Sequence, residues 1–275
     1  MSTRLRSALP YLGIAAIVAY CLAPFYWMLV SSLRRTSDIF DSGPIPSPLS
    51  FESYTAAFDD RNGFLRSLLN SFIVAGATTV LVLLFATFAA YALARLTFRF
   101  KNAVLALIIA TSMFPGISLL IPLLDLFSDI DWINTYQAMI VPNVGYVLPL
   151  AVWNLTAFFR QMPGELEEAA QIDGCTPAQA FRKVILPIAT PGVFTTAIIT
   201  FIAAWNEFII ALSVVNREEL KTAPVITSQF TGTTQFDSPF GTQMAAGVIV
   251  TIPLVILVLL FQRRIVAGLT AGGVK

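Results

Sequence analysis

One polar stretch, from Pro163 to Pro187, interrupts an otherwise apolar sequence and carries side chains suited to charge pairing. It reads PGELEEAAQIDGCTPAQAFRKVILP. Pro163 favours a helix start, and Glu165, Glu167 and Glu168 follow where the positive end of a helix dipole stabilises carboxylates. The chain contains no histidine, which removes the usual proton shuttle and the commonest metal ligand. It also lacks a Gly-x4-Gly-Lys phosphate loop, so we predict that it is not an enzyme and carries no ATPase of its own.

Helix signals divide this polar stretch into two short helices. Gly174 is predicted to end the first, which would be roughly 15 Å long and cannot cross the roughly 30 Å of a bilayer. Thr176 and Gln179 form a capping box for the second, with Pro177 at its first position. In the first helix, one face is expected to be formed by Leu166, Ala169, Ala170 and Asp173. The side chains on this face are small, so another backbone could approach it closely. Two short helices joined at a glycine predict an elbow.

The composition outside this stretch is typical of an integral membrane protein. Of the 275 residues, 56% are hydrophobic and 12% are charged, and the net charge of +1 argues against nucleic acid. The first apolar run exceeds a signal-peptide core and lacks a small-x-small cleavage site, so we interpret it as a spanning helix instead of a cleaved signal. Six runs are predicted to span the membrane: 9–30, 68–94, 103–127, 138–159, 188–212 and 243–261.

The distribution of basic residues predicts the orientation of these six spans. Six crossings place both termini on one side, and eleven of the seventeen basic residues fall on that side, so we expect both termini in the cytoplasm. Arg34 and Arg35, close to the outer end of the first span, are a weak contradiction. The eleven are Arg4, Arg6, Arg95, Arg99, Lys101, Arg160, Arg182, Lys183, Arg263, Arg264 and Lys275.

The polar stretch resembles a known loop. Glu168-Ala169-Ala170, then Gly174, then Val184, Leu186 and Pro187 are similar to the EAA loop, EAA-x3-G-x9-I-x-L-P, of permease subunits in binding-protein-dependent ABC importers. Val184 in the isoleucine slot is the one departure. The tail from Gly268 to Lys275, a frayed end on sequence alone, also resembles that of maltose-type permeases. The resemblance thus covers nearly the whole chain.

This resemblance implies a fold, a function and a set of partners. The fold would be an all-α membrane protein with six transmembrane helices, in which a type I importer permease core of the MetI-like kind (68–275, with its coupling loop at 163–187) follows a leading span and outer loop (1–67). The function would be ATP-driven import of a sugar, such as the disaccharide trehalose, across the plasma or inner membrane. The partners would be a second homologous permease, two ATPase subunits that hold ATP and Mg, an extracytoplasmic sugar-binding protein and membrane lipid. This chain itself would bind no cofactor.

The resemblance also implies which residues transmit force from the ATPase. Ala169 and Ala170 would pack into a groove of the ATPase, Gly174 would make the sharp turn, and Glu168 would offer a carboxylate to a basic residue of the partner. The predicted ATPase-coupling set is Glu165, Glu168, Ala169, Ala170, Asp173, Gly174, Leu186 and Pro187.

A second group of polar and helix-breaking residues lies within the predicted spans. Trp205, Asn206 and Glu207 lie roughly 27 Å beyond Pro187, where an ionisable residue indicates either a polar path or an anchor at the interface. Similar Trp-Asn-Glu segments are usual in sugar permeases. Prolines and glycines in spans three and four indicate either a bundle interior or ordinary kinks. The candidate path residues are Trp205, Asn206, Glu207, Pro115, Gly116, Asn143 and Gly145, and Pro142 and Pro149 lie beside them.

Two other classes of protein remain as alternatives. A secondary transporter driven by an ion gradient would predict inverted repeats and paired carboxylates in the membrane, and the sequence shows no repeat and only one candidate cluster of membrane carboxylates. A membrane-embedded enzyme would need a group of nucleophiles or metal ligands, and no such group is apparent.

Overall fold

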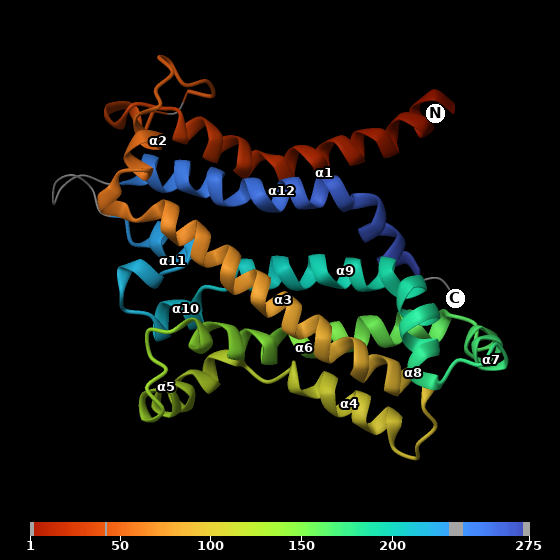
Figure 1. Ribbon diagram of the computed structural model, residues 1–275. Coiled ribbons are helices and arrows are strands. Elements are labelled where there is room, and N and C mark those ends of the chain that lie inside the picture. The colour runs from red at the N-terminus through yellow and green to blue at the C-terminus, as the bar shows by residue number, and fades with distance from the viewer. Residues whose placement is uncertain (1–2, 42, 231–238, 272–275) are drawn as a thin grey trace. The chain divides into compact units, whose positions relative to one another are not determined.

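The computed structural model describes residues 3–41, 43–230 and 239–271, and every regular element within them is helical (Figure 1). Five segments of this described part are long and apolar enough to cross a membrane, or six if one bent helix pair counts as a span. The predicted all-α fold is confirmed. The long helices are α1 (Thr3–Ser32), α3 (Phe64–Arg95), α6 (Tyr136–Gln161), α9 (Leu186–Trp205) and α12 (Phe240–Ala271).

The predicted third span, 103–127, is a broken helix pair, which counts as a sixth span only if its two arms are taken together. It consists of α4 (Lys101–Thr111) and α5 (Leu120–Asp129), and the two arms of this break meet at 83°. Between them Pro115 adopts an extended conformation with ψ 110°, and a short 3₁₀ helix follows over Gly116–Leu119. Proline has no N–H to continue the helix and disfavours the helical conformation in the residue before it, so the chain turns here.

The predicted fifth span, 188–212, also has different ends. Helix α9 stops at Trp205, and the separate short helix α10 covers Ile209–Val214. At the other end, α8 (Pro177–Ala180) and a π-helical turn, η4 (Phe181–Ile185), lead into α9 with no break. The second short helix of the predicted elbow is therefore the first turn of a long helix and not a separate element. A π-helical turn inside a longer helix often marks a functional position.

The chain forms two compact units, and the first comprises Met1–Arg66 with Ala223–Pro253. It contains α1, the short helices α2 (Glu52–Ala57) and α11 (Ala223–Ser228), and part of α12. Aromatic side chains connect its segments: Phe64 meets Phe230 edge-on with ring centroids 5.8 Å apart. The predicted division into residues 1–67 and 68–275 stays a prediction. Single 3₁₀ turns complete the described elements at Thr36–Asp38, Asp60–Asn62 and Glu218–Leu220.

Arg34, which contradicts the charge rule on sequence alone, has a structural role in this first unit. Its side chain is only 3% exposed and donates hydrogen bonds to the backbone carbonyls of Asp41 and Gly43. Its guanidinium also lies over the ring of Trp27, 5.1 Å from the centroid. Arg34 therefore holds the loop after α1, and its position follows from these bonds.

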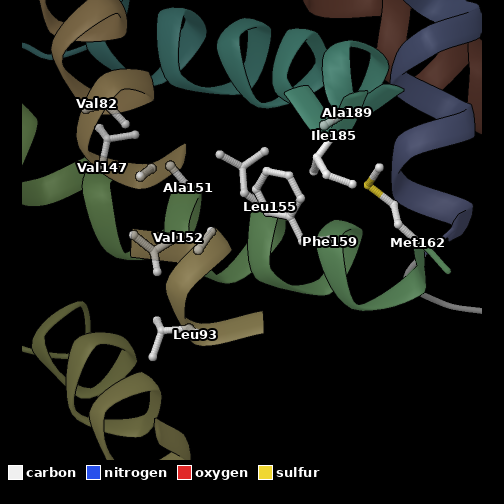
Figure 2. Close-up of a cluster of buried hydrophobic side chains, with 12 residues drawn as sticks. Val82, Leu93, Val147, Ala151, Val152, Leu155, Phe159, Met162, Ile185 and Ala189 are labelled. Atoms are coloured by element: carbon white, nitrogen blue, oxygen red, sulfur yellow. The ribbon is translucent and has the colours of Figure 1, made fainter. Parts of the chain in front are cut away.

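The second unit comprises Ser67–Thr222 with Leu254–Lys275, and its core lies where α3, α6 and α9 pack together (Figure 2). Buried side chains from α3 (Val82, Leu93) meet a row on α6 (Val147, Leu155, Phe159). The core also includes Ala86, Ala90, Ala151, Val152, Met162, Ile185 and Ala189. A shared apolar core of this kind fixes the end of α6 and the start of α9, between which the elbow lies.

Helices α6 and α9 approach most closely at Gly192. A Cβ atom at Gly192 would lie 2.5 Å from Cγ of Phe158, closer than real side chains come. Near this contact the Asn154 side-chain amide donates a 2.8 Å hydrogen bond to the hydroxyl of Thr196. Because Gly192 has no side chain, α9 can pack directly against the ring of Phe158 on α6.

Candidate coupling elbow and translocation path

The elbow is formed by α7 (Glu165–Ile172) and α8, which Gly174 joins. Gly174 has φ +84°, its N–H donates to the Gln171 carbonyl at 3.0 Å, and the N–H of Cys175 donates to the Ala170 carbonyl at 2.9 Å. These two bonds make a Schellman motif, which satisfies the free carbonyls of the helix end and requires a left-handed residue. The predicted stop at Gly174 is confirmed.

The start of the second arm is also as predicted. The Thr176 hydroxyl accepts a hydrogen bond from the Gln179 N–H at 3.3 Å, and the Gln179 side chain accepts one from the Thr176 N–H at 2.9 Å. Pro177 occupies the first turn. At the first arm the structure differs by two residues: α7 begins at Glu165 with Gly164 as its N-cap, so Pro163 precedes the helix instead of beginning it.

The predicted coupling residues of α7 lie on two different faces of the helix, and their role in coupling stays a prediction. Ala170 is only 5% exposed and, with the half-buried Leu166, packs towards the chain's own interior. Ala170 therefore does not face outward for an ATPase, because residues 166 and 170 lie four apart on the inner side of the helix. Ala169 and Asp173 lie on the exposed side, so the four residues predicted to share a face are divided between two faces.

The exposed face of α7 combines charge with one large apolar side chain. Glu165, Glu168 and Ala169 are exposed, and Ile172 is 86% exposed. These residues follow the three- and four-residue spacing of one helix face. We call this set, Glu165, Glu168, Ala169 and Ile172, the outer face of the elbow.

The second arm carries the remaining predicted residues into the membrane helix. Leu186 and Pro187 lie in the first turn of α9, where Leu186 is half-buried and Pro187 is exposed. Asp173 caps the end of α7 and is exposed. On the inner side, Leu166 from α7 and Phe181 and Val184 from η4 pack on the core drawn in Figure 2. Both arms of the elbow therefore rest on the same core.

Trp205 lies in an aromatic cluster. Its side chain is 1% exposed, and its ring lies 4.7 Å from that of Phe72 and 5.7 Å from that of Phe201. Packing inside the bundle is the role that this geometry supports, because neither face of the ring is open for a sugar to stack on.

Asn206 and Glu207 occupy the break between α9 and α10. Asn206 is exposed and donates a 2.9 Å side-chain hydrogen bond back to the Ile202 carbonyl. The two carboxylate oxygens of Glu207 accept from the N–H groups of Ile210 at 2.7 Å and Ala211 at 3.0 Å. Glu207 thus satisfies free N–H groups at the start of α10, as a helix cap does.

The other candidate path residues lie on and beside α6. Pro115 and Gly116 are exposed at the break after α4, and a Cβ at Gly116 would be 3.9 Å from the ring of Tyr146, the neighbour of exposed Gly145. Asn143 is different: it is 1% exposed, and in the described part of the chain neither polar atom of its side chain has a hydrogen-bond partner. A buried amide without a partner is costly, so Asn143 is an unusual position in α6.

Sequence reasoning did not identify two features of the elbow. Ile172 follows the EAA residues as one apolar residue among many, and only the placement of α7 shows it to be outward. Arg95, predicted only as one of eleven cytoplasmic cations, forms an ion pair with Glu167 at 3.0 Å. A basic residue at the end of a span is too common a signal to indicate this pairing. In the predicted tail, Gly268 to Ala271 belong to α12 and residues 272–275 lie outside the described residues.

Comparison with known proteins gives one family. The model of the family described as "Binding-protein-dependent transport system inner membrane component" matches residues 82–270. The chain is 44% identical over 259 residues to the trehalose transport system permease protein SugB of Mycobacterium tuberculosis (strain CDC 1551 / Oshkosh), with 94% of each chain covered. It is 39% identical over 272 residues to the trehalose/maltose transport system permease protein MalG of Thermococcus litoralis (strain ATCC 51850 / DSM 5473 / JCM 8560 / NS-C), with 98% of each covered.

A solved structure shares the same architecture. A chain of a bacterial ABC transporter involved in the import of the acidic polysaccharide alginate superimposes with a TM-score of 0.81 at 20% identity, covering 96% of this chain and 98% of that one. The likeness confirms the predicted importer-permease fold. The protein described here belongs to the family of inner membrane components of binding-protein-dependent transport systems, as a multi-pass permease of the ABC importer type.

Proposed function

We propose that this chain forms part of the membrane pathway through which an ATP-driven importer moves a sugar, with trehalose as the first candidate. The choice of substrate rests on two relatives that match almost the full length of the chain, both of which are named for trehalose transport. Agreement over the spans, the elbow and the loops favours a shared cargo more than a match to the elbow alone would. The break between α9 and α10 and the exposed break at Pro115 and Gly116 are the positions we assign to the path.

The elbow is the site at which ATP binding acts on this chain. Its outer face offers carboxylates at Glu165 and Glu168 and an apolar side chain at Ile172, a combination suited to a groove with a basic rim. The chain catalyses no reaction and binds no cofactor. ATP and Mg belong to the two ATPase subunits, whose closure carries α7 and, through the continuous helix from Pro177, α9. ATP shifts the equilibrium between conformations only by its difference in affinity for them.

The remaining partners follow from the same assignment. A second, homologous permease completes the pathway, and an extracytoplasmic binding protein delivers the sugar. Both termini of this chain lie in the cytoplasm, because the side that holds the elbow also holds most basic residues near the ends of the spans. Arg34 lies near the outer end of the first span, but its hydrogen bonds to the loop after α1 account for its position there. It therefore counts less against the cytoplasmic bias of basic residues.

The experiment is to purify the tagged chain gently from its own membrane, identify the proteins that come with it, and reconstitute the complex in proteoliposomes. We expect an ATPase subunit and a second permease in the complex, and uptake of labelled trehalose that requires both ATP and the binding protein. Maltose and sucrose serve as matched disaccharide controls. Uptake by the chain alone, driven by an ion gradient without ATP, would contradict the proposal and restore the secondary-transporter alternative.

A further inference from the structure

The last residue of α3 contacts both α7 and the link that leads into it. The Arg95 Nε atom lies 3.0 Å from Oε1 of Glu167, and the two side chains are only 14% and 18% exposed. The same guanidinium donates through Nη2 to the backbone carbonyls of Met162 at 2.8 Å and Pro163 at 3.4 Å. Arg95 therefore holds the link between α6 and α7 together with a side chain from the middle of α7.

One helical turn earlier on α3, Tyr91 contacts both arms of the elbow. Its hydroxyl interacts electrostatically with the carboxylate of Glu167 in α7. Its ring lies 4.5 Å from the ring of Phe181 in η4, tilted by 50°, and meets Phe159 of α6 edge-on at 5.9 Å. A second ring of α3, Phe88, lies 5.7 Å from Phe181. The first arm is thus bound to α3 by charge, and the second by aromatic packing.

The Arg95–Glu167 ion pair is largely shielded from water, and each charge is compensated mainly by the other. Among the described residues, buried Arg95 Nε and Glu167 Oε1 make no hydrogen bond to another group that would replace the ion pair. Removing one member of such a pair leaves the other charge buried and uncompensated, which is more costly than losing both. The contact is therefore expected to stay intact as the elbow moves.

We propose that Tyr91 and Arg95, which we call the α3 clamp, make α3 a second output of the elbow beside α9. Helix α9 moves with the elbow because it is continuous with the second arm. Helix α7 is joined to the bundle by the 162–164 link, by the Gly174 turn and by Leu166 on the core. The clamp adds a direct bond from α7 to α3, so a displacement of α7 is transmitted to α3. Because α3 contributes Val82 and Leu93 to the core in Figure 2, its movement repacks the helices around the path. Tyr91 and Arg95 are positioning residues, and their role rests on the proposed coupling function of the elbow.

The test distinguishes a loss of force transmission to α3 from a loss of protein stability, because it removes both charges of the ion pair together. In the complete reconstituted complex, Arg95→Gln and Glu167→Gln each leave one buried charge and are expected to lower thermal stability. The double variant Arg95→Gln/Glu167→Gln removes both, so its melting temperature should return towards that of the wild type. Tyr91→Phe deletes only the hydroxyl and keeps the aromatic packing. Arg99→Gln, a nearby basic residue whose cation lies over the ring of Phe100, is the matched control.

The quantity to measure is the number of sugar molecules imported per ATP hydrolysed. Coupling between two sites in a protein typically amounts to about fivefold or more, so the double variant should retain its ATPase subunits and import at least about fivefold less sugar per ATP. Tyr91→Phe should show a smaller fall, and Arg99→Gln none. A double variant with the wild-type ratio would overturn the clamp. If that variant does not assemble, an unchanged ratio in Tyr91→Phe overturns it instead. Absence of ATP-driven uptake in the wild type would count against the proposed function and not against the clamp.

Discussion

Ile172 is the most exposed large apolar side chain on the elbow. At 86% exposure, it presents an apolar surface to water, beside the carboxylate of Glu168 and the small side chain of Ala169 on the same face of α7. An isolated exposed isoleucine is ordinary on a protein surface. One placed at the end of a face that also carries carboxylates, on a polar helix that cannot span the membrane, is suited to fill a pocket on a partner.

Replacement of Ile172 by aspartate should weaken the attachment of the ATPase without unfolding the chain. Burial of one isoleucine side chain is worth about 1.5–3 kcal/mol, which corresponds to roughly a tenfold to hundredfold loss of affinity. The measurement is the amount of ATPase subunit retained on the tagged, solubilised chain as the complex is diluted. Ile172→Val keeps the apolar contact and is the control. Equal retention by the aspartate and valine variants would show that Ile172 is outside the contact.

The sequence predicts the local signals of the elbow better than its orientation. Gly174 and the Thr176 capping box could be recognised because each depends on bonds within a few residues. Which side of α7 faces outward depends on its contacts with α3 and η4, so the burial of Ala170 could not be predicted from the spacing of residues within α7. Glu207 is a similar case, since its bonds to Ile210 and Ala211 become evident only once the break before α10 is known.

At the scale of elements, the packing of α6 on α9 determines how the elbow is seated. Gly192 is the position where this packing allows no side chain, because a Cβ would lie 2.5–2.8 Å from three ring atoms of Phe158. The hydroxyls of Thr195 and Thr196 bond the carbonyls of Pro191 and Gly192, each at 2.9 Å. Both hydroxyls therefore bond within α9 itself, to carbonyls one turn earlier.

Gly192→Ala should destabilise the complex, because overpacking a well-filled contact costs about 1–3 kcal/mol. A lower melting temperature of the purified complex would report this loss. Phe158→Leu in the Gly192→Ala background shortens the opposing side chain and should recover part of it. Gly145→Ala, on the exposed side of α6 with open space around it, controls for a general effect of adding a methyl group. A Gly192→Ala complex as stable as the wild type would show that the ring moves aside without cost.

Hydropathy predicted the long helices, and the helix breaks within the predicted spans account for its errors. The runs at α1, α3, α6 and α12 are continuous apolar segments, which a membrane requires of any span. The run at 103–127 has the same composition but contains Pro115 and Gly116, and composition does not show that the chain turns by 83° there. Asn206 likewise bonds back to α9 and Glu207 bonds the start of α10, and a hydropathy average cannot detect such side-chain bonds.

At the scale of the whole molecule, a change at the elbow is expected to alter sugar transport at a distant point in the membrane. Most of α7 is in contact with solvent, and most of α9 is within the apolar bundle. Coupling requires that the elbow moves as a rigid body, and the Schellman motif at Gly174 and the capping box at Thr176 provide this rigidity. The central claim is therefore that the shape of the elbow, beyond its presence, couples ATP hydrolysis to import.

The most direct test changes that shape with two glycine variants that differ in backbone conformation alone. Gly174 has φ +84° and Gly164 has φ −70°, and a Cβ at either position meets nothing within 4 Å. Valine is strongly disfavoured at positive φ but adopts −70° readily. In the reconstituted complex, Gly174→Val should hydrolyse ATP and import at least about fivefold less sugar per ATP, while Gly164→Val should match the wild type. Equal ratios of sugar to ATP in both variants would contradict the account, because the turn at Gly174 would then have no part in coupling.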